Sequence, residues 1–118
     1  MDFSKAKIVE GPKAGDKAKA EITGVEDTTW REYLTANGRI DKIENFENPD
    51  AGQILIGIKT ADGREFDELY TAPEDVTKIS VISNIGKFYE MYNKFPEAGD
   101  KVEVMADKKG FWKLFVGI

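Results

Sequence analysis

The chain has 118 residues, a length typical of one domain, and 41% of them are hydrophobic, enough for an ordinary folded core. It contains neither cysteine nor histidine, which excludes disulfides, thiolate nucleophiles and the commonest ligands of zinc and iron. The formal net charge is −5, because residues 26–75 hold thirteen acidic and five basic residues. The protein therefore lacks the overall basic field expected of a tight duplex DNA binder.

The first fifteen residues are polar, and we expect them to precede a single domain over residues 16–118. They lack the apolar core of a signal peptide, and no run approaches the roughly 20 apolar residues that cross a bilayer. We expect a soluble, cytoplasmic protein that does not bind membranes.

The first predicted element is a half-buried strand over Lys17–Val25. Ala18, Ala20 and Ile22 share one face, and charged or polar residues occupy the other. Gly24 within this run predicts a bulge or sharp bend, where a small barrel turns a corner.

Residues 26–52 are predicted to form an inserted hairpin. Asn37-Gly38 is a favoured pair for a two-residue turn, and its flanks, Trp30–Thr35 and Arg39–Ile43, would form two short strands. Asn48–Gly52 is predicted to be a turn that leads out of this insert.

A second hairpin has a clearer pattern. Gln53–Lys59 is a β-branched run with an isoleucine at every second position, which predicts a strand. Ala61–Gly63 contains the favoured turn pair Asp-Gly, and Arg64–Tyr70 would return as the partner strand.

One helix is predicted, over Ser80–Lys94. Ser80 or Thr77 would cap its start, and Gly86 would mark close packing against a strand. An amphipathic stripe repeats at spacings of four, three and four residues: Val81, Ile85, Phe88 and Tyr92.

Two strands, Lys101–Ala106 and Phe111–Val116, end the chain, joined by a turn at Lys108–Gly110. The predicted fold is therefore all-β with one helix, a five-stranded OB-fold-like β-barrel in which the helix follows the third strand.

In this order of elements the chain resembles small OB-fold domains that bind single-stranded nucleic acid, of the kind found in replication protein A and in phage and archaeal relatives. The connection over residues 26–52 is longer than is usual in that family. An SH3-like barrel is the alternative fold, but a long helix between its strands fits it poorly. The resemblance is carried by Lys17–Val25, Gln53–Tyr70, Ser80–Phe95 and Lys101–Val116.

The first candidate site is the segment Lys108–Lys113, which holds three lysines and two aromatic rings without an acid. Lys108, Lys109 and Lys113 would neutralise phosphates, and Trp112 would stack on a base. Strand alternation places only one of Phe111 and Trp112 toward the core. The alternative is an ordinary solvated turn with a core aromatic beside it.

Two further candidates lie elsewhere in the chain. Trp30, Arg31 and Tyr33 form a possible stacking site in the insert, opposite the first candidate across one groove, or else they pack the insert onto the barrel. The outward face of the second hairpin is the other, although the neighbouring Asp67 and Glu68 would repel phosphate. Its proposed members are Lys59, Arg64, Phe66 and Tyr70.

Acidic residues do not form a recognisable catalytic or metal site, because no spacing matches a calcium loop and no glycine-rich phosphate loop is present. We expect no catalytic residue, cofactor or bound transition metal. The acids weighed for this role are Asp62, Glu65, Asp67 and Glu68, and the pair Glu74-Asp75.

The sequence thus predicts a non-catalytic module that binds single-stranded DNA, or RNA, with low sequence specificity. The alternative is a protein–protein interaction module, a subunit of a replication, repair or phage assembly, which the acidic middle segment favours. A third possibility is a structural protein whose edge strands pair in an oligomer.

Overall fold

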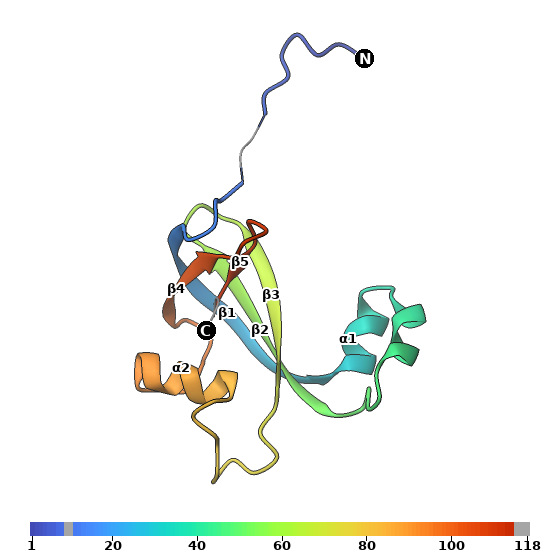
Figure 1. Cartoon of the computed structure of the whole chain (residues 1–118), viewed down its shortest axis with the longest axis vertical. Helices are drawn as coiled ribbons and strands as arrows, with labels where there is room; N and C mark the ends of the chain where they lie inside the picture. The colour runs from blue at the N-terminus through green and yellow to red at the C-terminus, as the bar shows by residue number, and fades with distance from the viewer. Residues whose placement is uncertain (9–10, 115–118) are drawn as a thin grey trace.

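The computed structural model describes residues 1–8 and 11–114. Five antiparallel strands form one sheet in the order β3-β2-β1-β4-β5, curled into a nearly closed barrel (Figure 1). The predicted fold class, an all-β barrel of OB-like topology, is confirmed. The strands are β1 (Lys17–Thr29), β2 (Gly52–Thr60), β3 (Glu65–Thr71), β4 (Lys101–Ala106) and β5 (Trp112–Lys113).

Strand β1 is the centre of the sheet and pairs with a different neighbour at each end. Residues 17–21 pair with β4, and residues 20–29 pair with β2. The predicted bulge is confirmed: the register shifts between Ile22 and Gly24. Gly57 lies opposite the bulge, and its lack of a side chain leaves room for Thr23. A Cβ on residue 57 would lie only 2.7 Å from Thr23 Oγ1.

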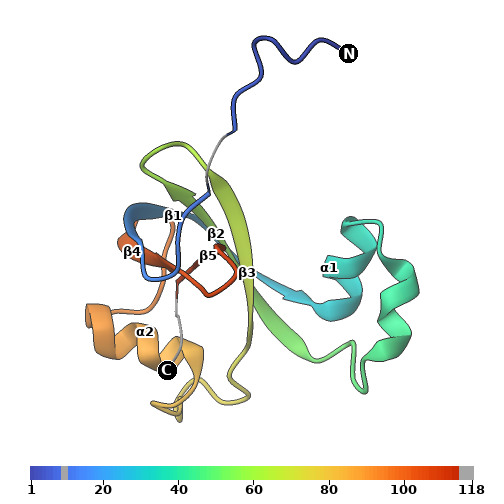
Figure 2. The same cartoon turned by 45° about the horizontal axis from the view of Figure 1, so that its top comes forward.

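The core fills the barrel and is closed at one end by helix α2 (Asn84–Tyr92), as Figure 2 shows. From α2, Ile85 and Phe88 are buried as predicted, and Tyr92 is partly buried against the same cluster. No helix among the described residues is long and apolar enough to cross a membrane. The strands contribute Ala20, Ile22, Ile56, Ile58, Tyr70, Val102, Val104 and Leu114 to this core.

Helix α2 is shorter than predicted, because Ser83 rather than Ser80 caps its start. The Ser83 hydroxyl accepts a hydrogen bond from Gly86 N at 3.1 Å, and residues 80–83 form a turn before the helix. Val81 and Ile82 are consequently exposed, Ile82 by 80%, and do not belong to the buried stripe. Gly86 packs against this turn and not against a strand, since a Cβ there would overlap the Ser80 carbonyl.

The predicted hairpin within residues 26–52 is wrong. The segment forms helix α1 (Trp30–Ala36) and the 3₁₀ helix η1 (Ile40–Asn45), which stand to one side of the barrel (Figure 1). Thr29 caps α1 by accepting from Glu32 N at 3.1 Å, and Asn37 ends it. Gly38 then adopts a φ of +69°, so the Asn-Gly pair terminates a helix instead of turning a hairpin.

Among the described residues, the last strand covers only Trp112 and Lys113, and Phe111 and Leu114 lie outside its ladder. Residues 115 and 116, the end of the predicted strand, lie outside the described residues. Residues 1–8 are exposed and project away from the barrel (Figure 1).

Replacement of Phe88 by alanine should destabilise the domain by about 3–5 kcal/mol, because the ring is only 1% exposed and its loss leaves a cavity. Tyr89→Ala is the matched control, since this neighbouring ring is 43% exposed and its loss should cost far less. Thermal melts of both variants check this. Equal melting temperatures for the two variants would contradict the placement of α2.

Candidate nucleic-acid interface

The two outer strands of the sheet, β3 and β5, face each other along a seam that no strand ladder among the described residues closes. They are joined instead through a side chain: Leu114 N donates to Glu68 Oε1 at 3.0 Å. Two adjoining hollows of about 500 and 340 Å³ follow this seam. Asp67 and Lys113 line both hollows. We call the two hollows together the seam groove.

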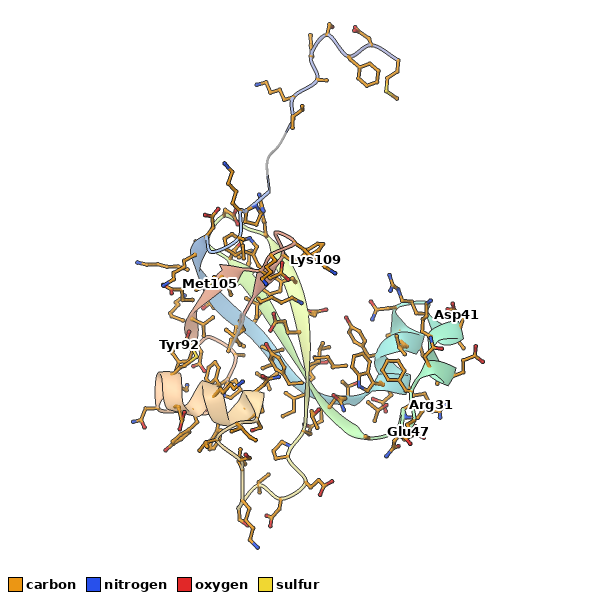
Figure 3. All side chains as sticks on the ribbon, viewed as in Figure 1. Arg31, Asp41, Glu47, Tyr92, Met105 and Lys109 are labelled. Atoms are coloured by element: carbon orange, nitrogen blue, oxygen red, sulfur yellow. The ribbon has the colours of Figure 1, made fainter. Side chains whose placement is uncertain are left out.

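One end of the seam groove is formed by the turn between β4 and β5, which Asp107 holds in shape. Its carboxylate accepts from Phe111 N at 3.0 Å and from Lys109 N at 2.9 Å, and the Phe111 hydrogen bond is the main cause that lowers the pKa of Asp107. Gly110 takes the positive φ that the turn requires. Lys108 and Lys109 are exposed on this turn, and Figure 3 labels Lys109 there.

Phe111, and not Trp112, presents its ring to solvent at this end. Phe111 is 62% exposed, whereas Trp112 is partly buried against the core. The Trp112 Nε1 atom is buried and has no hydrogen-bond partner among the described residues. Both rings line the groove, but the exposed stacking surface predicted for Trp112 belongs to Phe111.

The other end of the seam groove is formed by α1. Trp30 and Tyr33 line it together with Lys113, so the structure brings these three predicted site residues to one hollow. Trp30 is also part of the insert's own packing, because it stacks on Phe46 with ring centroids 4.6 Å apart and meets Tyr33 edge-on at 6.2 Å. The Trp30 ring therefore both packs the insert and lines the groove.

Arg31 does not line the groove. Its guanidinium forms two hydrogen bonds with Asp50, at 2.7 and 3.2 Å, which raise the pKa of Arg31 and lower that of Asp50. Figure 3 shows Arg31 on the insert, far from Lys109 on the β4–β5 turn. The predicted arrangement in which Arg31 faces Lys108 and Lys109 across one groove is not what the structure shows.

The strand register places the proposed members of the candidate face on the second hairpin on different sides of the sheet. Ile58 pairs with Phe66 and Ile54 with Tyr70, so both rings face inward with the isoleucines and not outward as predicted. Lys59 faces outward on another side of the barrel. Arg64 lies in the β2–β3 turn, where it pairs with Asp62 at 3.3 Å and lines the seam groove.

Charges of both signs meet in the seam groove. Arg64 and Lys113 contribute positive charge, and Glu65 and Asp67 oppose it. Glu68 is 8% exposed, and burial raises the pKa of its carboxyl, partly offset by the Leu114 N–H and the Lys113 charge. The acids of the groove therefore offset its cations.

Within residues 1–8 and 11–114, no three acidic side chains gather closely enough to hold a metal ion. No family model, curated protein or solved structure matches the chain. The fold and the geometry of the seam groove are therefore the features that bear on function.

Glu68→Gln should raise the melting temperature at pH 7 by on the order of a few degrees. Because the pKa of Glu68 is raised, the folded state favours the protonated carboxyl. The protonated group stabilises the fold fully below the pKa of an unfolded glutamate, and this stabilisation is lost as pH rises through the pKa of Glu68 in the folded protein. Glutamine keeps an oxygen for Leu114 N and removes the buried charge. The difference should vanish in acid, where wild-type Glu68 is neutral.

Melts of wild type and variant across pH 3–8 measure this difference, with Glu65→Gln, at an exposed acid of the same strand, as the control. A difference that stays constant with pH would show that the charge of Glu68 is not the cause.

Proposed function

We propose that this domain is a non-catalytic module that binds single-stranded DNA, or RNA, with little sequence preference. The observation that carries the proposal is the seam groove, which has aromatic rings at both ends and Lys113 between them. Phe111 lies at one end, and Trp30 and Tyr33 lie at the other.

The position of the groove agrees with how barrels of this topology use their loops. Ligands of OB-fold barrels are gripped between the connection of the first two strands and the connection of the last two. Here the first connection is the α1–η1 insert and the second is the β4–β5 turn, and both border the seam groove.

Stacking and phosphate contacts would share the binding energy. A base stacked on an aromatic ring contributes about 1–3 kcal/mol whatever its identity, which accounts for low sequence preference. Lys108, Lys109 and Lys113 provide cations around the exposed Phe111 ring, and Arg64 adds one that is shared with Asp62. With Glu65 and Asp67 nearby, we expect binding to be strongest at low salt.

A protein-interaction module remains the second candidate function. The acids of the seam groove favour a protein ligand over a phosphate ligand. Three apolar side chains in the loop between β3 and α2, Val76, Val81 and Ile82, are also exposed and suited to contact with a protein surface.

Phe111→Ala should weaken binding of a fluorescent oligothymidine by about 5- to 150-fold, the equivalent of one lost stacking contact. The fold should survive, because this ring is exposed. Phe95→Ala is the matched control, an exposed phenylalanine that stacks on Tyr89 and does not line the groove. Fluorescence anisotropy measures both affinities. Equal affinity of the two variants would exclude Phe111 as a stacking surface.

The double variant Lys108→Glu/Lys109→Glu should bind the same oligonucleotide more weakly and with a flatter salt dependence, because fewer counterions are released on binding. Titrations at several salt concentrations give the slope. If wild-type protein shows no binding to a long single strand even at low salt, the nucleic-acid proposal fails and the protein-interaction module takes its place.

A further inference from the structure

A second surface, on the outer face of β1, β2 and β4, gathers four lysines: Lys17, Lys19, Lys59 and Lys101. We call it the lysine face. The register explains why these lysines meet, since Glu21 of β1 is paired with Lys59 on one side and with Lys101 on the other. Residues paired across antiparallel strands share one face of the sheet, and Lys17 and Lys19 alternate onto that face.

Two of the four lysines of the lysine face are held in ion pairs and two are not. Lys101 Nζ lies 3.0 Å from Glu21 Oε1, and Lys17 Nζ lies 3.8 Å from Glu103 Oε1. Lys19 and Lys59 form no ion pair with any residue in the described part of the chain. In the strand register Lys19 lies opposite Glu103 and Lys59 lies opposite Glu65, but neither lysine forms an ion pair with that acid, so both ammonium groups are available to an anion.

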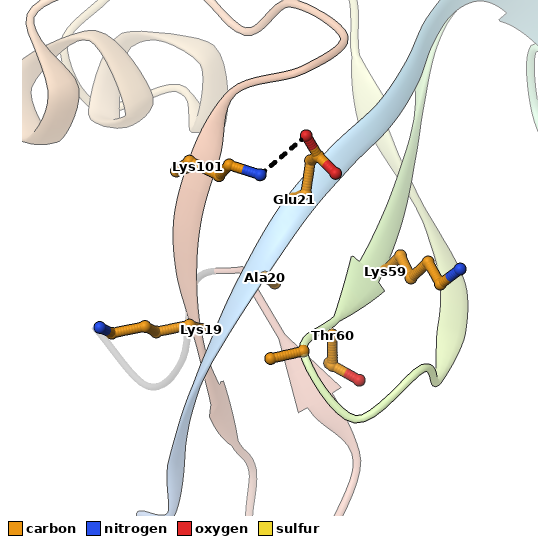
Figure 4. Close-up of a pocket in the computed structure, with 7 residues that line it drawn as sticks. Lys19, Ala20, Glu21, Lys59, Thr60 and Lys101 are labelled. Atoms are coloured by element: carbon orange, nitrogen blue, oxygen red, sulfur yellow. Dashed lines mark hydrogen bonds and ion pairs between the residues drawn. The ribbon is translucent and has the colours of Figure 1, made fainter.

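The shape of the face indicates the kind of anion that fits it. Lys19, Lys59 and Lys101 line a shallow hollow of about 300 Å³. In Figure 4 the side chains of Lys19 and Lys59 extend in different directions, away from each other. A chain with repeated phosphates can contact both ammonium groups in this arrangement. No aromatic ring lines the hollow, so it offers no stacking surface for a base.

The surroundings of the lysine face limit the path that such a chain can take. Beyond the bulge, the same outer side of the sheet has a hollow lined by Glu26 and Asp67, whose charges repel phosphate. In the other direction lies the β2–β3 turn. Thr60 and Ala61 line the lysine face, and Arg64 at the end of this turn lines the seam groove.

We infer that the lysine face binds backbone phosphates of the same single strand whose bases stack in the seam groove, with the β2–β3 turn between the two surfaces. This inference rests on the proposed function. It predicts a longer strand footprint than the seam groove alone provides, and it assigns Lys19 and Lys59 to phosphate binding without base contact.

The test variant is Lys19→Gln/Lys59→Gln, which removes the two unpaired cations and leaves no acid without its partner. The control is Lys42→Gln/Lys78→Gln, an equal charge change at exposed lysines of η1 and of the β3–α2 loop. The probes are oligothymidines of about 4 and about 16 nucleotides, the limits of typical OB-fold site sizes.

For the long probe, the test variant should bind several-fold more weakly than the control variant. Its slope of log affinity against log salt should be shallower by about 1.4, since each phosphate contact on a single strand contributes about 0.7. For the short probe, which the seam groove can hold alone, the two variants should bind equally.

Three results would overturn the inference. If wild type binds the long probe and the test variant matches it in affinity and slope, the lysine face is not used and the seam groove keeps its role. An equal loss in the control variant would assign the effect to total charge. If wild type binds neither probe but binds polyglutamate, the proposed function fails as well, and the lysine face is a site for an acidic protein.

Discussion

A bulge in β1 interrupts its ladder with β2 and bends the strand at the centre of the sheet. Ile22 pairs with Ile58 and Gly24 pairs with Gly57, so Thr23 is an extra residue without a partner on β2. The β1–β2 ladder continues on both sides of the bulge, whereas β4 pairs only with residues 17–21 before it. The extra residue bends β1 and increases its twist at this point, which helps the sheet to curl. Gly57 leaves room for the Thr23 side chain, because a Cβ at residue 57 would lie 2.7 Å from Thr23 Oγ1 and would force that hydroxyl to move.

The same bulge divides the outer surface of the barrel by charge. An added residue changes which positions of a strand face outward. Before the bulge, Lys17 and Lys19 share the outer face with Lys59 and Lys101. Beyond it, Glu26 and Asp67 border the next hollow. A chain with an acidic total charge thus retains a separate basic surface, a property that the net charge alone conceals.

Much of the fold could be predicted from the sequence, because alternation over the strands reflects burial directly. The insert could not, since Asn-Gly ends a helix as readily as it turns a hairpin. Two signals favoured the helix: the capping pair Thr29 and Glu32, and the spacing of Trp30, Tyr33 and Leu34 along one helical face. For α2, the pattern indicated Ser80 or Thr77 as the cap, whereas Ser83 serves, and the close approach of Gly86 to the Ser80 carbonyl is a tertiary feature with no local signal.

The candidate site was predictable only in part. Trp112 shares strand parity with the buried Leu114, which places Trp112 inward and Phe111 outward, but the aromatic residues on both sides obscured this pattern. The pairing of Arg31 with Asp50, nineteen positions away, has no local signal. Convergence of Lys19, Lys59 and Lys101 depends on strand register, so only the folded chain reveals it.

Amide chemical-shift mapping of the isotope-labelled full chain, titrated with an oligothymidine, locates the bound strand on the barrel residue by residue. If the seam groove holds the bases, the largest shift changes fall at residues 111–113 and 30–33, with smaller changes at Lys19 and Lys59. Changes confined to α2 and the loop at residues 72–83, or no changes at all, would contradict this placement of the strand.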